Sequence, residues 1–122
     1  DLGNLFGHIT MEAAYKDGGE WLDELKIYLE KNIDFAYDFL QKEVPAVTFL
    51  KPQSSFLLWL DFRKTGLSHK EIRDRLINVS KLGLNDGLAF GDDGEGFFRM
   101  NIGTNLARVE EGLIRIRKGF KF

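Results

Sequence analysis

The stretch from residue 84 to residue 102 constrains the fold most, because a glycine-rich loop leads there directly into a short alternating segment. Glycine reaches positive φ at no steric cost, so the loop can turn sharply and bring its backbone close to another surface. The alternation that follows predicts a strand. Its core face holds Phe98, Met100 and Ile102, and its other face holds Phe97, Arg99 and Asn101.

Arg99 and Asn101 place a fixed cation beside an amide on that second face, a pair that can hold a carboxylate. A structural interpretation stays open, because an arginine in a strand often forms an ion pair within its own protein, and Asp61 or Asp86 could be the partner. The loop is not a phosphate-binding loop of a familiar kind. It lacks G-x-x-x-x-G-K-[ST], and its G-x-G at 94–96 lacks the strand before and the helix after that a dinucleotide site requires.

Composition narrows the functional classes. The 122 residues suit one domain with a real core, and a net charge of −2 argues against nucleic acid or an anionic membrane as the main partner. Without cysteine there is no disulfide framework and no thiolate nucleophile. His8 and His69 are the only histidines, and neither stands near carboxylates at ligand spacing, so no metal site is expected. No apolar run is long enough for a membrane span.

Helical periodicity predicts one long helix from Glu20 to the Val44-Pro45 pair, since the residue before proline disfavours α geometry. We expect its buried stripe to hold mainly aromatic residues: Trp21, Leu25, Tyr28, Leu29, Asn32, Phe35 and Phe39. A shorter helix is predicted upstream, over residues 11–16. The N-terminal residues 1–9 show the helical spacing of apolar residues only in part, and we interpret them as part of a segment that continues from a longer protein.

Two further helices are predicted downstream. Ser68 and Glu71 form a capping box that opens the first of them, with Gly83 as its C-terminal cap, and His69 is expected to be a solvated surface residue. This helix should bury Ile72, Leu76 and Val79. The last helix begins at about Asn105 and should bury Leu106, Val109, Leu113, Ile116 and Phe120.

Two strands are predicted between the long helix and the capping box, over residues 46–50 and 54–63. The second should place one side against the core, namely Phe56, Leu58, Leu60 and Phe62. With the strand at 97–102, the order predicts an α+β fold: a small two-layer domain of about three antiparallel strands packed with helices.

Several segments also resemble one known family. The letters GEWLDEL at 19–25, with YLEKN at 28–32, resemble the long helix that opens the C-terminal small domain of class I/II aminotransferase-family enzymes, which depend on pyridoxal phosphate (PLP). The resemblance is closest to the cystathionine β-lyase (C–S lyase) branch. FLLWLDFR at 56–63 is similar to its "TYLxWLDFR" strand, and residues 84–101 match its "LNDGxxFGxxGxGFxRxN" signature. FG at 6–7 and EAAY at 12–15 match the segment just upstream.

This resemblance implies a site. In the family the arginine of the last strand pairs with the α-carboxylate of the amino-acid substrate, a role that transfers to Arg99, with Asn101 as a second candidate. The lysine that holds PLP, its aspartate partner and its phosphate-binding residues belong to the large domain, so no catalytic or cofactor-binding residue is expected in this chain. We therefore expect residues 1–18 to be a helical segment that follows the large domain and residues 19–122 to be the small domain, inactive alone.

The resemblance leaves the reaction open between a C–S lyase acting on cystathionine or cysteine-type amino acids, an aminotransferase, and a non-catalytic regulatory relative. An independent binding domain, with Arg99 as a structural ion pair, is the fourth interpretation. Two segments depart from the family pattern: GTNL at 103–106, and Ser55-Phe56 in place of Thr-Tyr. The parent enzyme is expected to be a cytoplasmic homodimer without nucleic-acid or membrane partners.

Overall fold

Alternating apolar residues build a three-stranded antiparallel sheet at the centre of the molecule. The computed structural model describes residues 3–121, and its strands are β1 (Leu57–Asp61), β2 (Asn85–Asp86) and β3 (Phe97–Asn101). Their order is β1-β3-β2, so β3 lies between the other two. Within residues 3–121 this is the predicted α+β class with the predicted number of strands.

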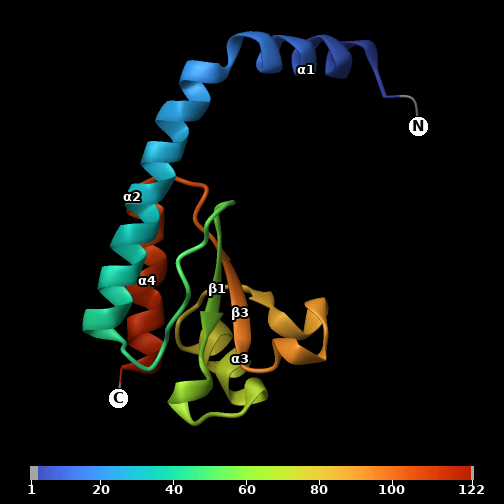
Figure 1. Ribbon diagram of the computed structural model, residues 1–122. Helices are drawn as coiled ribbons and strands as arrows, with labels where there is room; N and C mark the ends of the chain where they lie inside the picture. Colours follow the sequence, from blue (N-terminus) through green and yellow to red (C-terminus); the bar gives the residue numbers. More distant parts are fainter. Residues whose placement is uncertain (1–2, 122) are drawn as a thin grey trace.

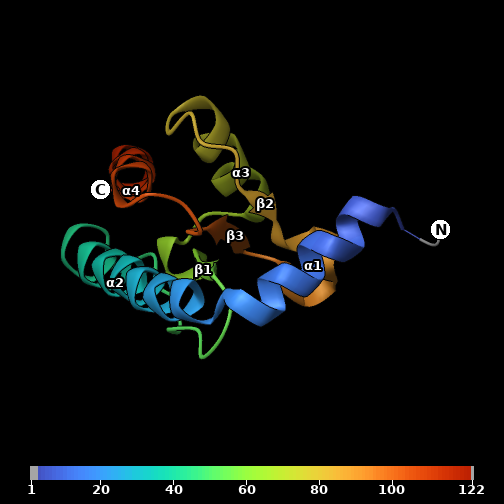
Figure 2. The same cartoon turned by 90° about the horizontal axis from the view of Figure 1, so that it is seen from above.

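Helices cover one face of this sheet. α2 (Gly19–Glu43), α3 (His69–Asn78) and α4 (Leu106–Phe120) form the second layer, with α4 beside both α2 and α3 (Figures 1 and 2). The core lies between the layers and holds the predicted strand residues Leu58, Leu60, Phe62, Phe98, Met100 and Ile102, together with helix residues that include Leu40, Ile72, Leu76, Val109, Leu113 and Ile116. The capping box is confirmed: Ser68 and Glu71 bond each other's backbone at the start of α3.

α1 (Leu5–Asp17) extends away from both layers, at an angle to α2 (Figure 1). It begins earlier than the predicted helix at 11–16, and none of its residues is buried. Leu5, Phe6, Ile9, Met11 and Tyr15 are all exposed on it.

The prediction was wrong about which segment forms the third strand. Residues 46–50 contribute only an isolated bridge between Thr48 and Asp61. The third strand is Asn85–Asp86, two residues inside the segment that we expected to be loop. A glycine-rich loop that folds back over β3 brings these two residues into register with Arg99 and Phe98.

Several burial predictions were also wrong. In α2 the buried residues are Asn32, Ala36 and Leu40, and Trp21 is 66% exposed, because the helix runs beyond the end of the sheet at its start. Val79, Leu106 and Phe56 were expected in the core and are exposed to 41%, 37% and 43%. Each stands at or just beyond the end of an element, where periodicity no longer decides which face is covered.

The C-terminal cap of α3 is not Gly83. The helix ends at Asn78, and the chain turns at Lys81, which adopts a positive φ of 52°. Ser80 donates its backbone N–H to the carbonyl of Arg75, and Leu82 donates to that of Leu76. No helix within residues 3–121 is both long and apolar enough to cross a membrane.

Candidate carboxylate-binding site

The face of the sheet that the helices leave uncovered carries a continuous row of cations and aromatic rings. The guanidinium carbon of Arg63 lies 4.5 Å from the centre of the Phe97 ring, and that ring stacks on Trp59 at 5.7 Å. Trp59 meets the edge of Phe90 at 5.6 Å, and the guanidinium carbon of Arg99 lies 4.5 Å from the Phe90 ring centre. We call these five side chains, three aromatic rings and two arginines, the cation–aromatic row. It places Arg99 at one end, on a flat apolar support.

Arg99 is held by neutral groups. Its Nη2 donates to Asn85 Oδ1 at 3.3 Å, and its guanidinium carbon lies over the ring of Phe90. Its Nε is buried and has no hydrogen-bond partner among residues 3–121, and no carboxylate of these residues forms an ion pair with it. The guanidinium is therefore a fixed cation with unused donors.

The two acids that could have paired with Arg99 in the structural interpretation both bond other residues. Asp61 accepts from both Nε (3.0 Å) and Nη2 (2.8 Å) of Arg63, which with the Arg63 backbone N–H holds the pKa of Asp61 below its ordinary value. Asp86 bonds His69 instead. The two acids thus leave Arg99 without a charged partner.

Asn101 lies two residues from Arg99 on the same strand and is exposed. Its Oδ1 accepts the backbone N–H of Gly103 at 2.8 Å, so the side-chain carbonyl is engaged. Arg99 and Asn101 line one hollow at the edge of the sheet, together with Asn85 and Arg108. Arg108, in the first turn of α4, was not predicted as a site residue, since sequence periodicity marks it only as polar.

The glycine loop brings Phe90 to Arg99 by folding tightly on itself. It contains two 3₁₀ turns, η2 (Gly87–Phe90) and η3 (Asp92–Gly94), and Asp86 opens the first by accepting the N–H of Leu88 at 2.9 Å. Gly87 and Gly94 are buried against each other. A Cβ on Gly94 would collide with the carbonyl of Gly87, so this close approach requires glycine.

Gly94→Ala is expected to lower the free energy of unfolding of the 122-residue chain by about 2 kcal/mol, because backbone must move to admit the methyl group. Urea unfolding followed by tryptophan fluorescence measures it. Gly83→Ala is the matched control: a Cβ there meets nothing within 4 Å. Equal urea midpoints for the two variants would show that the loop does not close as described.

His69 is not the solvated surface residue that we predicted. Its side chain is only 9% exposed, and its ring stacks on Phe98 at 4.8 Å. Nε2 lies 2.8 Å from Asp86 Oδ1, and Nδ1 accepts the N–H of Gly96 at 2.9 Å. These partners are 17 and 27 residues away in the chain, so nothing local in the sequence signals them.

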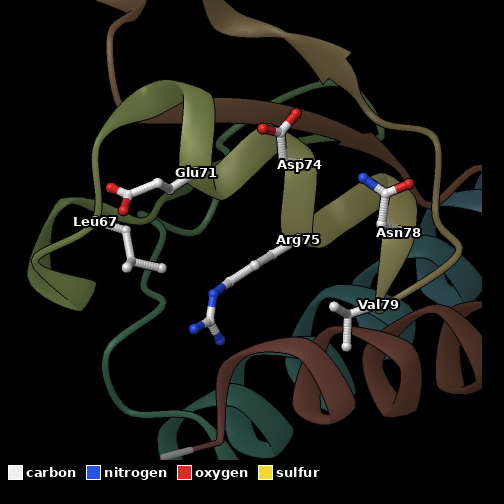
Figure 3. Close-up of a pocket in the computed structure, with 6 residues that line it drawn as sticks. All are labelled: Leu67, Glu71, Asp74, Arg75, Asn78 and Val79. Carbon is white, nitrogen blue, oxygen red and sulfur yellow. The ribbon is translucent and has the colours of Figure 1, made fainter.

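A second surface pocket lies on α3 and is separate in its residues from the Arg99 hollow. Leu67, Glu71, Asp74, Arg75, Asn78 and Val79 line it (Figure 3). Arg75 reaches from α3 toward α4, where its Nη1 donates to the carbonyl of Gly119 at 3.1 Å. This arginine joins two helices. Among residues 3–121, no group of three or more His, Asp or Glu could hold a metal ion.

Comparison with known proteins identifies relatives of this chain. No protein-family model matches the chain. Cystathionine β-lyase PatB of Bacillus subtilis (strain 168) is 46% identical over 114 residues, which are 93% of this chain and 30% of PatB. Protein MalY of Escherichia coli (strain K12) is 35% identical over 101 residues, which are 83% of this chain and 26% of MalY. The chain therefore spans less than a third of the length of these relatives.

Solved structures agree in fold. Cystalysin from Treponema denticola, which contains a pyridoxal 5'-phosphate cofactor, superposes with a TM-score of 0.91 and 30% identity over 97% of this chain and 30% of its own. Cystalysin and the other structural neighbours of this chain are fold-type I PLP enzymes. By sequence and by fold, the homologues of this chain are cystathionine β-lyases and PLP-dependent aminotransferase-like proteins, and the similarity extends over most of the chain.

Proposed function

We propose that Arg99 binds the α-carboxylate of an amino-acid substrate in a PLP-dependent C–S lyase, of which this chain is the C-terminal domain. One observation carries the proposal: a guanidinium fixed on Phe90 and by Asn85 keeps a buried Nε without a partner. Arg99 as a whole is half-buried, and a buried N–H without a partner, such as its Nε, is costly unless a ligand completes it. An amino-acid carboxylate supplies two acceptors and the opposite charge, which suits a planar fork.

The surroundings of Arg99 support a carboxylate in particular. The guanidinium carbon lies over the Phe90 ring, 4.5 Å from its centre, and the N–H groups of a guanidinium point outward in its plane, where a carboxylate can pair with two of them. Asn101 lines the same hollow with its carbonyl engaged by Gly103, which leaves its amide nitrogen as a further donor. Arg108, on the rim, adds positive charge. We assign Arg99 as the carboxylate ligand and Asn101 as an accessory donor.

PLP would be held outside this chain. Within the described residues the hollow is lined by guanidinium, amide and apolar groups, with no lysine amine to which the cofactor could attach, so it does not fit PLP itself. We propose that the attaching lysine belongs to a large domain of the same polypeptide, with residues 1–18 following that domain and residues 19–122 forming the small domain. The bound cofactor supplies an electron sink at the α-carbon of the substrate. This chain alone should then be inactive.

The C–S lyase reaction is favoured because PatB, at 46% identity, is named a cystathionine β-lyase. An aminotransferase is the second candidate, since a PLP-bound protein of Clostridium difficile 630 that superposes with a TM-score of 0.93 and 38% identity is described as one. Both reactions need the α-carboxylate held in place, so Arg99 has the same role in each. The choice between them is made by groups outside this chain.

The full-length parent protein tests the proposal. Its visible spectrum, recorded before and after addition of L-cystathionine, should show a yellow cofactor band that changes with substrate, and pyruvate should be released. A yellow protein that makes no pyruvate but passes its amino group to a keto acid would be an aminotransferase. A colourless protein would exclude both. Sedimentation of the same sample should give a homodimer.

A further inference from the structure

We propose that His69 is a positioning residue for the Arg99 site: it ties together the two ends of the glycine loop and so fixes Phe90, the ring that supports the guanidinium. The proposal rests on the proposed function of Arg99 as a carboxylate ligand. It adds a residue on another element, α3, that has no contact of its own with substrate in this scheme.

The first step is the hydrogen bonding of the imidazole. Nδ1 accepts the backbone N–H of Gly96, so Nδ1 carries no hydrogen. In the neutral ring the hydrogen is then on Nε2, where it is donated to Asp86 Oδ1 at 2.8 Å. Asp86 is the residue before η2 and Gly96 follows η3, so one ring bonds the start and the end of the loop at residues 86–96.

The second step is the rigidity of that ring. His69 lies flat on Phe98, with ring centres 4.8 Å apart and planes 13° from parallel. Phe98 is buried in the core and packs against Phe62. The position of His69 is therefore set by the core and by the first turn of α3, and the loop takes its position from His69.

The third step leads to Arg99. Within residues 3–121, its guanidinium donates to Asn85, directly before Asp86, and lies over the ring of Phe90, at the end of η2. Phe90 lies inside the loop at 86–96 that His69 closes, whereas Asn85 precedes this loop in β2 and pairs with Arg99 across the sheet. Loss of the two His69 hydrogen bonds would thus free Phe90, the aromatic support of the guanidinium, and would loosen the residue next to Asn85.

A held guanidinium binds better than a mobile one. An arginine that is free to change rotamer loses conformational entropy when it pairs with a carboxylate, whereas one already stacked and hydrogen-bonded loses less. The role of His69 is therefore to keep the fork oriented before substrate arrives. A loss of orientation should appear in KM more than in kcat.

Three substitutions in the full-length enzyme separate the two hydrogen bonds. His69→Asn keeps an acceptor near Nδ1 for Gly96, His69→Gln keeps a donor near Nε2 for Asp86, and His69→Leu removes both. We expect His69→Leu to raise KM for the amino-acid substrate about tenfold while kcat changes by less than about twofold. The two amide variants should show smaller increases in KM, which is partial rescue.

Leu76→Val is the control for stability, because Leu76 is buried on the same helix and bonds neither end of the loop through its side chain. It should lower the thermal midpoint and leave KM unchanged. Hydrogen exchange on the full-length protein gives a readout besides activity. Amides in residues 85–96 should exchange faster in His69→Leu than in Leu76→Val.

The outcomes distinguish this inference from the proposed function. If Arg99→Lys raises KM while His69→Leu leaves both KM and exchange in 85–96 unchanged, Arg99 binds carboxylate and the positioning role of His69 is wrong. If Leu76→Val raises KM as much as His69→Leu, the effect is one of general stability, and the inference is again overturned. If Arg99→Lys leaves KM unchanged, the carboxylate site does not exist and both proposals fail.

Discussion

Arg99→Ala in the full-length enzyme is expected to raise KM for an L-amino-acid substrate about a hundredfold, the largest functional effect of any single change in this chain. The variant removes two charge-assisted hydrogen bonds and leaves the substrate carboxylate beside Phe90 without a counter-charge. Losing one partner of such a pair costs about 2–5 kcal/mol, and each 1.4 kcal/mol is tenfold in affinity. Steady-state kinetics of the parent enzyme measure the effect.

Two comparisons show whether the loss belongs to the carboxylate. Arg99→Lys keeps the charge but loses the planar fork, so its KM should fall between those of wild type and Arg99→Ala. A substrate analogue without the carboxylate should bind wild type and Arg99→Ala equally. Arg115→Ala, which removes an arginine paired with Glu111, should leave KM unchanged. An equal loss of affinity for the analogue would contradict the assignment.

The elements that could be predicted from the sequence are those whose signals are local. The capping box at Ser68 depends on residues three positions apart, and the core face of β3 follows from strict alternation, so both are confirmed. β2 could not be predicted, because Asn85 and Asp86 have low strand propensity and pair with β3 only after the glycine loop has folded back. Residues 46–50 have good strand composition, yet only Thr48 finds a partner.

The residues of the candidate site also divide into those that the sequence signals locally and those that it does not. Arg99 stands out in the sequence as a cation in an apolar strand and by its family signature. Its supports do not, because Asn85 and Phe90 lie 14 and 9 residues before it and reach it through the loop. His69 was interpreted as solvated since its partners come from distant segments. Tertiary contacts of this kind carry no periodic signal.

Asn32 lies in a helix that was predicted well, and its burial was expected from the buried stripe. Its hydrogen-bond partners were not predicted, because they come from a distant segment. Asn32 is 1% exposed, and its Nδ2 donates to the carbonyls of Ile102 at 3.1 Å and Thr104 at 2.9 Å. These carbonyls follow β3 closely, so this one amide ties α2 to the segment that leads from Arg99 and Asn101 into α4. Its function depends on donating two hydrogen bonds, which no other oxygen-bearing side chain of its size can do.

Asn32→Asp should therefore lower the free energy of unfolding of the 122-residue chain by about 3–5 kcal/mol at neutral pH, since it sets a buried acceptor against two carbonyl oxygens. Urea unfolding measures this. Asn105→Asp is the matched control. There the side chain caps α4 by accepting the N–H of Arg108 at 3.0 Å, a role that aspartate fills equally well. Its cost should be within about 0.5 kcal/mol.

The pH dependence of the two variants distinguishes the mechanism from a simple packing defect. Burial without a donor raises the pKa of the carboxyl group that Asn32→Asp introduces, so the folded chain retains that proton to higher pH than the unfolded chain does. The deficit in stability should then be smallest in acid and grow as the pH rises above the ordinary carboxyl pKa. A deficit that stays constant from acid to neutral pH would mean that the two carbonyls have another donor, and that Asn32 is not what holds this segment to α2.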